Sequence, residues 1–220
     1  MRPKDLKFPF TWDQRKPVLH EGVLIVPKHF EKHEDFCLKS EVDFSRPVSI
    51  EYCSGNGDWV IEQAQHNPNH LWIAVEKQFE RVRKIWSKMC NHQIENLLIV
   101  CGDALTFTRE YLWENAIDEI FVNFPDPWPK PRHAKHRLIK KPFVDAISSV
   151  VLKGGRAVYA TDHHPYALQM IKEMERHQSW KSIFPEPFFT NEWKEYGRSW
   201  FGDLFERKGE QTHFIQYQAL

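Results

Sequence analysis

A proline-rich loop carrying one acid and one aromatic residue is the segment of this sequence best suited to chemistry. Asn123-Phe124-Pro125-Asp126-Pro127-Trp128-Pro129-Lys130 follows an apolar run that is typical of a buried strand. Because the prolines fix φ, they stiffen this loop. The loop therefore holds the Asp126 carboxylate in place, and Trp128 offers a flat face on which a nucleobase could stack.

Basic residues follow this loop: Lys130, Arg132, Lys135, Arg137, Lys140 and Lys141. No Asp or Glu occurs between Asp126 and Asp145. Such a local positive patch suits phosphates. The whole chain has 30 basic and 30 acidic residues, so attraction of a nucleic acid would have to come from this local charge. We interpret His133 and His136 as phosphate contacts rather than zinc ligands, and we expect no metal.

A second candidate site combines a glycine loop with acids at successive strand ends. Glu51-Tyr52-Cys53-Ser54-Gly55-Asn56-Gly57 joins a predicted strand to a predicted helix, and Val60 replaces the third glycine of a dinucleotide fingerprint. Glu76 and Asp103-Ala104 end the next two strands. Glu76 could accept hydrogen bonds from ribose hydroxyls, and Asp103 from an adenine amino group. Because an adenosine without phosphates needs such acceptors, S-adenosylmethionine fits better than NAD or ATP.

The elements that position these residues alternate along the chain. Short apolar runs predict strands at Val48–Cys53, Leu71–Val75, Leu97–Cys101, Ile117–Phe124 and Arg156–Thr161. Helical patterns cover Asp58–His66, Phe79–Met89, Phe143–Leu152 (ended by Gly154-Gly155) and Pro165–His177. Thr212–Gln218 is predicted as an antiparallel edge strand. This order predicts an α/β fold with a mostly parallel sheet and helices on both faces.

The chain's 220 residues suit one domain of ordinary size. We assign residues 1–45 to an N-terminal extension of undetermined structure and residues 46–220 to the catalytic domain. The four cysteines, Cys37, Cys53, Cys90 and Cys101, have no CxxC spacing. Neither a signal peptide nor a membrane span is evident. We therefore expect a cytoplasmic protein without a membrane or an obligatory protein partner.

The segment Asn123–Leu138 resembles the signature of the bacterial tRNA (guanine-N7)-methyltransferases, and further similarity runs from about Ile50 to Arg207. The resemblance implies a Rossmann-like class I methyltransferase fold. It also implies methyl transfer from S-adenosylmethionine, with S-adenosylhomocysteine as product, to N7 of a tRNA guanine at position 46 in the variable loop.

By this resemblance Glu51, Glu76, Asp103 and Asp126 match cofactor-binding acids, and Asp126 matches the catalytic position. Gly55, Gly57 and Ala104 complete the predicted cofactor site. Predicted substrate contacts are Lys130, Asp162, Thr190, Glu192, Arg132, Lys135 and Arg137. Thr190 opens a T-x-x-E-like segment whose acid, Glu192, comes one place early, and Asp203-Leu204-Phe205-Glu206-Arg207 resembles the closing motif. Cys53 stands where the family usually has a glycine.

Guanine N7 already carries a lone pair, so its methylation needs orientation of the base rather than a general base. Asp126, with Asp162, could stabilise the charge that develops on the ring. Three alternatives stay open: an N6-adenine or N4-cytosine methyltransferase, an NAD-linked oxidoreductase, and a non-catalytic RNA-binding protein with a methyltransferase fold. Cofactor titration, followed by identification of the methylated base, separates them.

Overall fold

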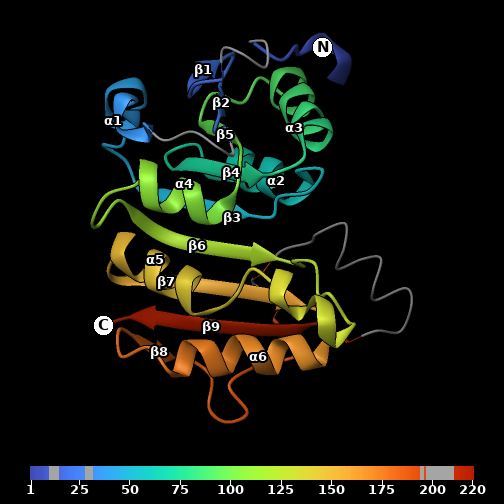
Figure 1. Cartoon of the computed structure of the whole chain (residues 1–220), viewed down its shortest axis with the longest axis vertical. Helices are drawn as coiled ribbons and strands as arrows, with labels where there is room; N and C mark the ends of the chain where they lie inside the picture. Colours follow the sequence, from blue (N-terminus) through green and yellow to red (C-terminus); the bar gives the residue numbers. More distant parts are fainter. Residues whose placement is uncertain (10–14, 28–31, 194–195, 197–210) are drawn as a thin grey trace.

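One sheet forms the centre of the molecule. The computed structural model describes residues 1–9, 15–27, 32–193, 196 and 211–220. Within these residues the strand order is β1-β2-β5-β4-β3-β6-β7-β9-β8 (Figure 1). The strands are β1 Val18–His20, β2 Val23–Ile25, β3 Val48–Tyr52, β4 Leu71–Glu76, β5 Leu97–Cys101, β6 Ile117–Asn123, β7 Val151–Thr161, β8 Trp180–Ser182 and β9 His213–Ala219.

The neighbouring strands from β2 to β7 in this order all pair in parallel. Every residue of β3, β4 and β5 is buried, as expected for parallel strands that are covered on both faces. The mostly parallel α/β sheet is therefore confirmed.

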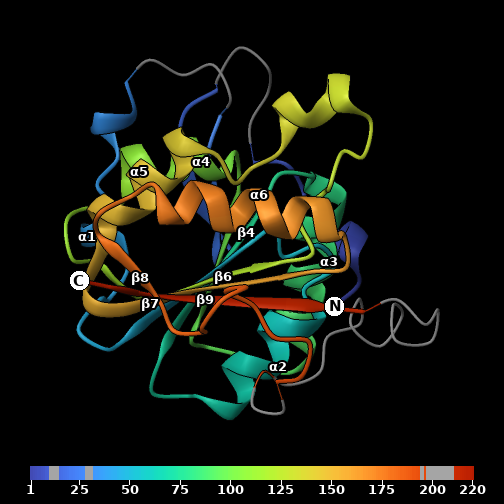
Figure 2. The same ribbon diagram turned by 90° about the horizontal axis from the view of Figure 1, so that it is seen from below.

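Helices cover both faces of the sheet (Figure 2). They are α1 Leu38–Glu41, α2 Asp58–His66, α3 Phe79–Asn91, α4 Ala104–Tyr111, α5 Lys141–Val150 and α6 His164–Glu175, with 3-10 turns η1 Pro3–Asp5, η3 His33–Asp35 and η4 Pro131–His136. On one face α4, α5 and α6 bury Phe107, Phe143 and Tyr166 in one core cluster. On the other, α2 and α3 bury Trp59 and Trp86 in a second cluster.

Two boundaries near the C-terminal half differ from the prediction. β7 begins at Val151, so Gly154-Gly155 lie inside a strand and do not end the preceding helix. A Cβ on Gly155 would lie 2.6 Å from the carbonyl oxygen of Asp118, which explains the glycine. β9 is antiparallel, as predicted, but it is not the edge strand, because β8 pairs along its outer side.

The N-terminal residues contribute two further strands. β1 and β2 form a hairpin whose turn, Glu21-Gly22, has positive φ at both residues (50° and 75°), as the common two-residue hairpin turn requires. β2 then pairs in parallel with β5. The start of the chain thus covers an edge of the parallel sheet.

Candidate active site

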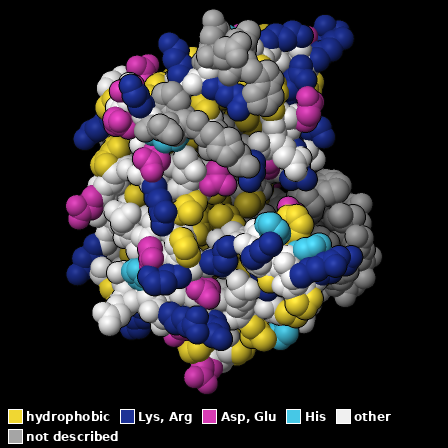
Figure 3. Space-filling model, viewed as in Figure 1, with side chains coloured by type: hydrophobic (Ala, Val, Ile, Leu, Met, Phe, Trp, Pro, Cys, Tyr) yellow, Lys and Arg dark blue, Asp and Glu magenta, His cyan; other side chains and the backbone are white. Residues whose placement is uncertain are grey.

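A cavity of about 690 Å³ opens at the carboxyl ends of the parallel strands. In the sheet, β3 lies between β4 and β6, where the order of winding reverses, and open α/β sheets bind ligands at that place. Figure 3 shows apolar side chains in the middle of one face of the molecule, bordered by Lys, Arg and His side chains. Of the predicted site residues, the cavity lining includes Gly55, Glu76, Asp103, Ala104, Asp126, Arg137 and Asp162.

The loop after β3 has a left-handed backbone at Cys53 (φ 63°), Gly55 (56°) and Gly57 (79°). A Cβ on Gly57 would lie 2.7 Å from Cγ1 of Ile85 on α3. Gly57 therefore lets the loop pack on this helix, and it does not line the cavity. Cys53 adopts the conformation that favours glycine, at a cost on the order of 1–3 kcal/mol.

Glu76, at the end of β4, holds the cavity wall in place by accepting hydrogen bonds from backbone amides. Its Oε2 accepts a hydrogen bond from the Gly55 amide at 3.0 Å, and its Oε1 accepts one from the Gln78 amide at 2.8 Å. The Arg81 guanidinium lies 3.7 Å from Oε2. Because a carboxylate has about four acceptor positions, Glu76 can still accept hydrogen bonds from ligand hydroxyls. Sequence reasoning missed Arg81, since a basic residue on a helix is usually solvated.

Asp103 follows β5 and caps α4. Its Oδ1 accepts a hydrogen bond from the Thr106 amide at 3.2 Å, and its Oδ2 lies 3.7 Å from Nζ of Lys77. The side chain is 40% exposed, so it is accessible to a ligand. Ala104 begins the helix and adds an apolar surface to the same wall.

Glu51 lies beneath the site and does not line the cavity. It is 2% exposed, and its Oε1 accepts a hydrogen bond from Nδ2 of Asn123 at 2.7 Å. The Tyr196 hydroxyl donates a hydrogen bond to Oδ1 of the same Asn123. Oε2 of Glu51 has no hydrogen-bond partner among the described residues. Burial raises the pKa of Glu51 from 4.5 to about 7. This acid therefore braces the start of the Asp126 loop and keeps one oxygen able to accept.

Asp126 stands on a loop with a left-handed residue on each side. Phe124 has φ 46° and Trp128 has φ 42°, which is uncommon for residues other than glycine. The Phe124 amide donates to the Ala160 carbonyl of β7 at 2.8 Å. Asp126 is exposed and Trp128 is 37% exposed, so the loop presents an acid and an indole ring at the cavity.

Arg137 supports this loop from below. It is 9% exposed, its Nε donates to the Pro127 carbonyl at 2.7 Å, and its NH1 donates to Oε1 of Gln169 at 2.6 Å. A hydrogen bond from a charged group contributes about 1.5–3 kcal/mol, which is comparable with the roughly 1–3 kcal/mol cost of one left-handed residue such as Trp128. Arg137 is thus buried, whereas Arg132 and Lys135 are exposed, and its role as a substrate contact stays a prediction.

The remaining predicted substrate residues do not line the cavity. Lys130, Arg132 and Lys135 are exposed on and beside η4. Thr190 pairs with Phe214 in an isolated bridge, its Oγ1 donates to the Glu192 carbonyl at 3.1 Å, and the Glu192 side chain is exposed. The predicted closing motif, residues 203–207, lies outside the described residues.

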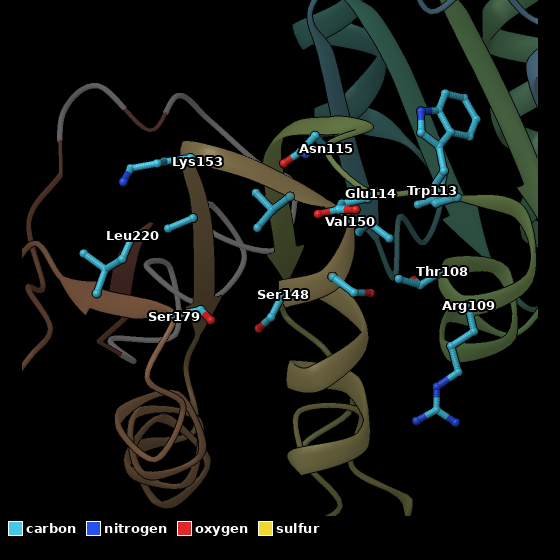
Figure 4. Close-up of a pocket in the computed structure, with 14 residues that line it drawn as sticks. Thr108, Arg109, Trp113, Glu114, Asn115, Ser148, Val150, Lys153, Ser179 and Leu220 are labelled. Atoms are coloured by element: carbon cyan, nitrogen blue, oxygen red, sulfur yellow. The ribbon is translucent and has the colours of Figure 1, made fainter.

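A second cavity, of about 430 Å³, lies at the opposite end of the sheet (Figure 4). Thr108, Arg109, Ser148 and Leu220 are among the residues that line it. The Thr108 and Ser148 hydroxyls already bond to backbone carbonyls of their own helices. None of the predicted site residues lies there.

Among the described residues, no three His, Cys, Asp or Glu side chains gather in a way that could hold a metal ion. No described helix is both long and apolar enough to cross a membrane.

Comparison with known proteins shows the family of the chain. Residues 45–213 match the family model described as "Putative methyltransferase". The chain is 47% identical to a tRNA (guanine-N(7)-)-methyltransferase of Chlamydia abortus and 45% identical to that of Chlamydia caviae. Each alignment covers 99% of this chain and 97% of the relative.

Among solved structures, a 16S rRNA (adenine(1408)-N(1))-methyltransferase from Catenulisporales acidiphilia is similar, with a TM-score of 0.59 and 13% identity. The match covers 93% of this chain and 97% of that one. At this identity it supports the fold alone, and the fold is that of the class I methyltransferases. The extent of the match to the family model and the identity to full-length relatives show that this chain belongs to the S-adenosylmethionine-dependent tRNA (guanine-N7)-methyltransferase family.

Proposed function

We infer that this chain transfers a methyl group from S-adenosylmethionine to N7 of a guanine in tRNA. One observation carries this conclusion: whole-length identity near 45% to enzymes of that name. The site is consistent with it, because the proline-rich Asp126 loop lies at the carboxyl edge of the sheet next to exposed basic residues. By resemblance we assign the target to position 46 of the variable loop.

The residues present fit S-adenosylmethionine. The cavity volume of about 690 Å³ is in the range of small-molecule sites. Glu76 and Asp103 supply acceptors that line the cavity, Ala104 an apolar wall, and Gly55 a wall without a side chain. The buried Oε2 of Glu51 has no hydrogen-bond partner among the described residues, which suits a positively charged hydrogen-bond donor of the bound cofactor. When bound, the cofactor supplies an electrophilic methyl group; no metal is part of the proposal.

In this proposal the protein's main contribution is orientation. Guanine N7 uses its own lone pair, so no side chain has to remove a proton. Asp126 and Asp162 both line the cavity, and their carboxylates could accept hydrogen bonds from the guanine edge and stabilise its developing positive charge. Trp128 offers a face for stacking. Lys130, Arg132 and Lys135 would bind phosphates, with Thr190 and Glu192 as further contacts, and a tRNA substrate suggests a cytoplasmic location.

The decisive experiment uses Asp126→Ala. We expect methyl transfer to unmodified tRNA to fall by at least about a hundredfold, which corresponds to roughly 2.7 kcal/mol, while the melting temperature changes little. Glu110→Ala, an exposed acid outside the cavity, is the matched control. Nucleoside analysis identifies the modified base. Wild-type turnover in folded Asp126→Ala, or a product other than 7-methylguanosine, would contradict the assignment.

A further inference from the structure

Arg137 differs in its surroundings from the other basic residues that follow the Asp126 loop. Arg132 and Lys135 are exposed, whereas Arg137 is buried and its guanidinium lies 4.8 Å from the centre of the Tyr166 ring. No acidic residue of the described chain forms an ion pair with it; it donates instead to the Pro127 carbonyl and to Oε1 of Gln169. A phosphate-binding arginine would be expected to present its donors to solvent.

The contacts of Arg137 join two walls of the cavity. The Pro127 carbonyl belongs to the loop that carries Asp126. Gln169 and Tyr166 belong to α6, and the chain enters α6 from Asp162 on the same cavity. Arg137 is therefore the link between the segments that carry the two carboxylates.

The partners of Arg137 are themselves held in place. The Gln169 Nε2 donates to the Ile139 carbonyl at 3.1 Å, and the Ile139 amide donates to the Tyr166 hydroxyl at 3.1 Å. The Tyr166 amide donates to Nδ1 of His163, next to Asp162, at 3.1 Å. This arrangement gives the guanidinium a fixed orientation, which a flexible surface contact would not need.

We propose that Arg137 is a positioning residue: it fixes the Pro127–Trp128 peptide against α6, so that Asp126 and Asp162 keep their relative placement during methyl transfer. The proposal rests on the proposed function, because it assumes that Asp126 acts on the base. It assigns tRNA phosphate binding to the exposed neighbours Arg132 and Lys135 instead.

Arg137→Lys separates the two roles. A lysine keeps the charge and could still meet a phosphate, but it cannot reproduce a planar fork that donates to two acceptors and stacks on a ring. We expect kcat at saturating tRNA and cofactor to fall about tenfold or more. The KM for tRNA and the dependence of tRNA affinity on salt should stay as in the wild type. Wild-type kcat in Arg137→Lys would overturn the proposal, and so would a flattened salt dependence.

Gln169→Leu gives an independent test, since it leaves Arg137 in place and removes one of its acceptors. We expect a fall in kcat of about threefold or more, without a change in salt dependence. Lys172→Leu, exposed on the same helix, is the matched control and should behave as the wild type. Lys135→Ala is the positive control for phosphate binding and should reduce the salt slope by about 0.9.

Protein stability and the proposed function are followed separately. Melting temperatures show whether each variant is folded at the assay temperature, and if Arg137→Lys is not, Gln169→Leu decides. A wild-type kcat in folded Gln169→Leu counts against the positioning role. Asp126→Ala, assayed alongside, reports on the function itself: its inactivity together with an active Arg137→Lys would refute only the role of Arg137.

Discussion

Four acids that the sequence presents as equivalent occupy four different environments. Glu51 is buried, Glu76 is held by backbone amides, Asp103 caps a helix, and Asp126 is exposed. The chemistry of a carboxylate depends on its solvation and partners. These acids therefore differ in access: Asp103 and Asp126 are the more exposed, whereas Glu51 and Glu76 are buried and hold loops, and Glu76 also lines the cavity.

The buried carboxyl of Glu51 predicts an unusual pH dependence of stability. Its pKa is about 7 in the folded protein and near 4.5 when solvated. Between these values the folded state holds a proton that the unfolded state has lost, so stability falls as pH rises, and the loss is complete above pH 7. A tenfold change in an ionisation equilibrium is about 1.4 kcal/mol, which sets an upper limit of roughly 3 kcal/mol.

Urea unfolding of the wild type and of Glu51→Gln at about pH 5 and about pH 8 checks this prediction. A glutamine at this position carries no charge, so its variant should lose less stability over this interval than the wild type does. The comparison cancels the groups that titrate in both proteins. Parallel stability curves would show that Glu51 is ionised at neutral pH and finds a compensating donor.

Among the secondary-structure elements, the strands that carry the site were predicted from short apolar runs, because buried parallel strands are apolar along their whole length. Short elements were not predicted; β8, for example, has three residues, too few to show a pattern. The predicted helix end at Gly154-Gly155 was wrong, because these glycines lie in a strand, where they allow close pairing.

The sequence also could not predict that Arg137 points toward α6. The basic residues from Lys130 to Lys141 look alike in the sequence. Arg137 is the buried one among them, because Tyr166 and Gln169 of α6 pack against it. Composition locates a basic segment, whereas tertiary contacts decide which of its residues face solvent.

The η4 segment carries a prediction about tRNA binding. Arg132→Ala with Lys135→Ala removes two exposed cations, and each phosphate contact contributes about 0.9 to the slope of log affinity against log salt. We expect weaker tRNA binding and a slope that is smaller by roughly 1.8, with unchanged cofactor affinity. Lys153→Ala with Lys181→Ala, exposed cations away from the site, is the control of equal charge. Equal slopes for the two double variants would place the binding surface elsewhere.

The N-terminal strands β1 and β2 help to stabilise the sheet, although every residue that lines the candidate site comes after residue 52. Val23, Leu24 and Ile25 of β2 are each at most 3% exposed. Burying a side chain of this size contributes about 1.5–3 kcal/mol, so together they approach the total stability of an ordinary domain, about 5–15 kcal/mol. Their pairing also covers the edge of β5.

Deletion of residues 1–26 should therefore abolish activity through loss of the fold, even though all cavity residues remain. The exposed edge of β5 is apolar, and such edges pair with other chains, so we expect aggregation and no cooperative urea transition. Deletion of residues 1–5, all exposed, removes four hydrogen bonds to α3, each of which contributes about 0.5–1.5 kcal/mol. It keeps Leu6 and both strands, so it should lower the unfolding midpoint but leave a cooperative urea transition. Sedimentation and urea unfolding compare the two truncations. A monomeric protein without residues 1–26 that unfolds at the wild-type midpoint would show that β3 to β9 hold the site unaided.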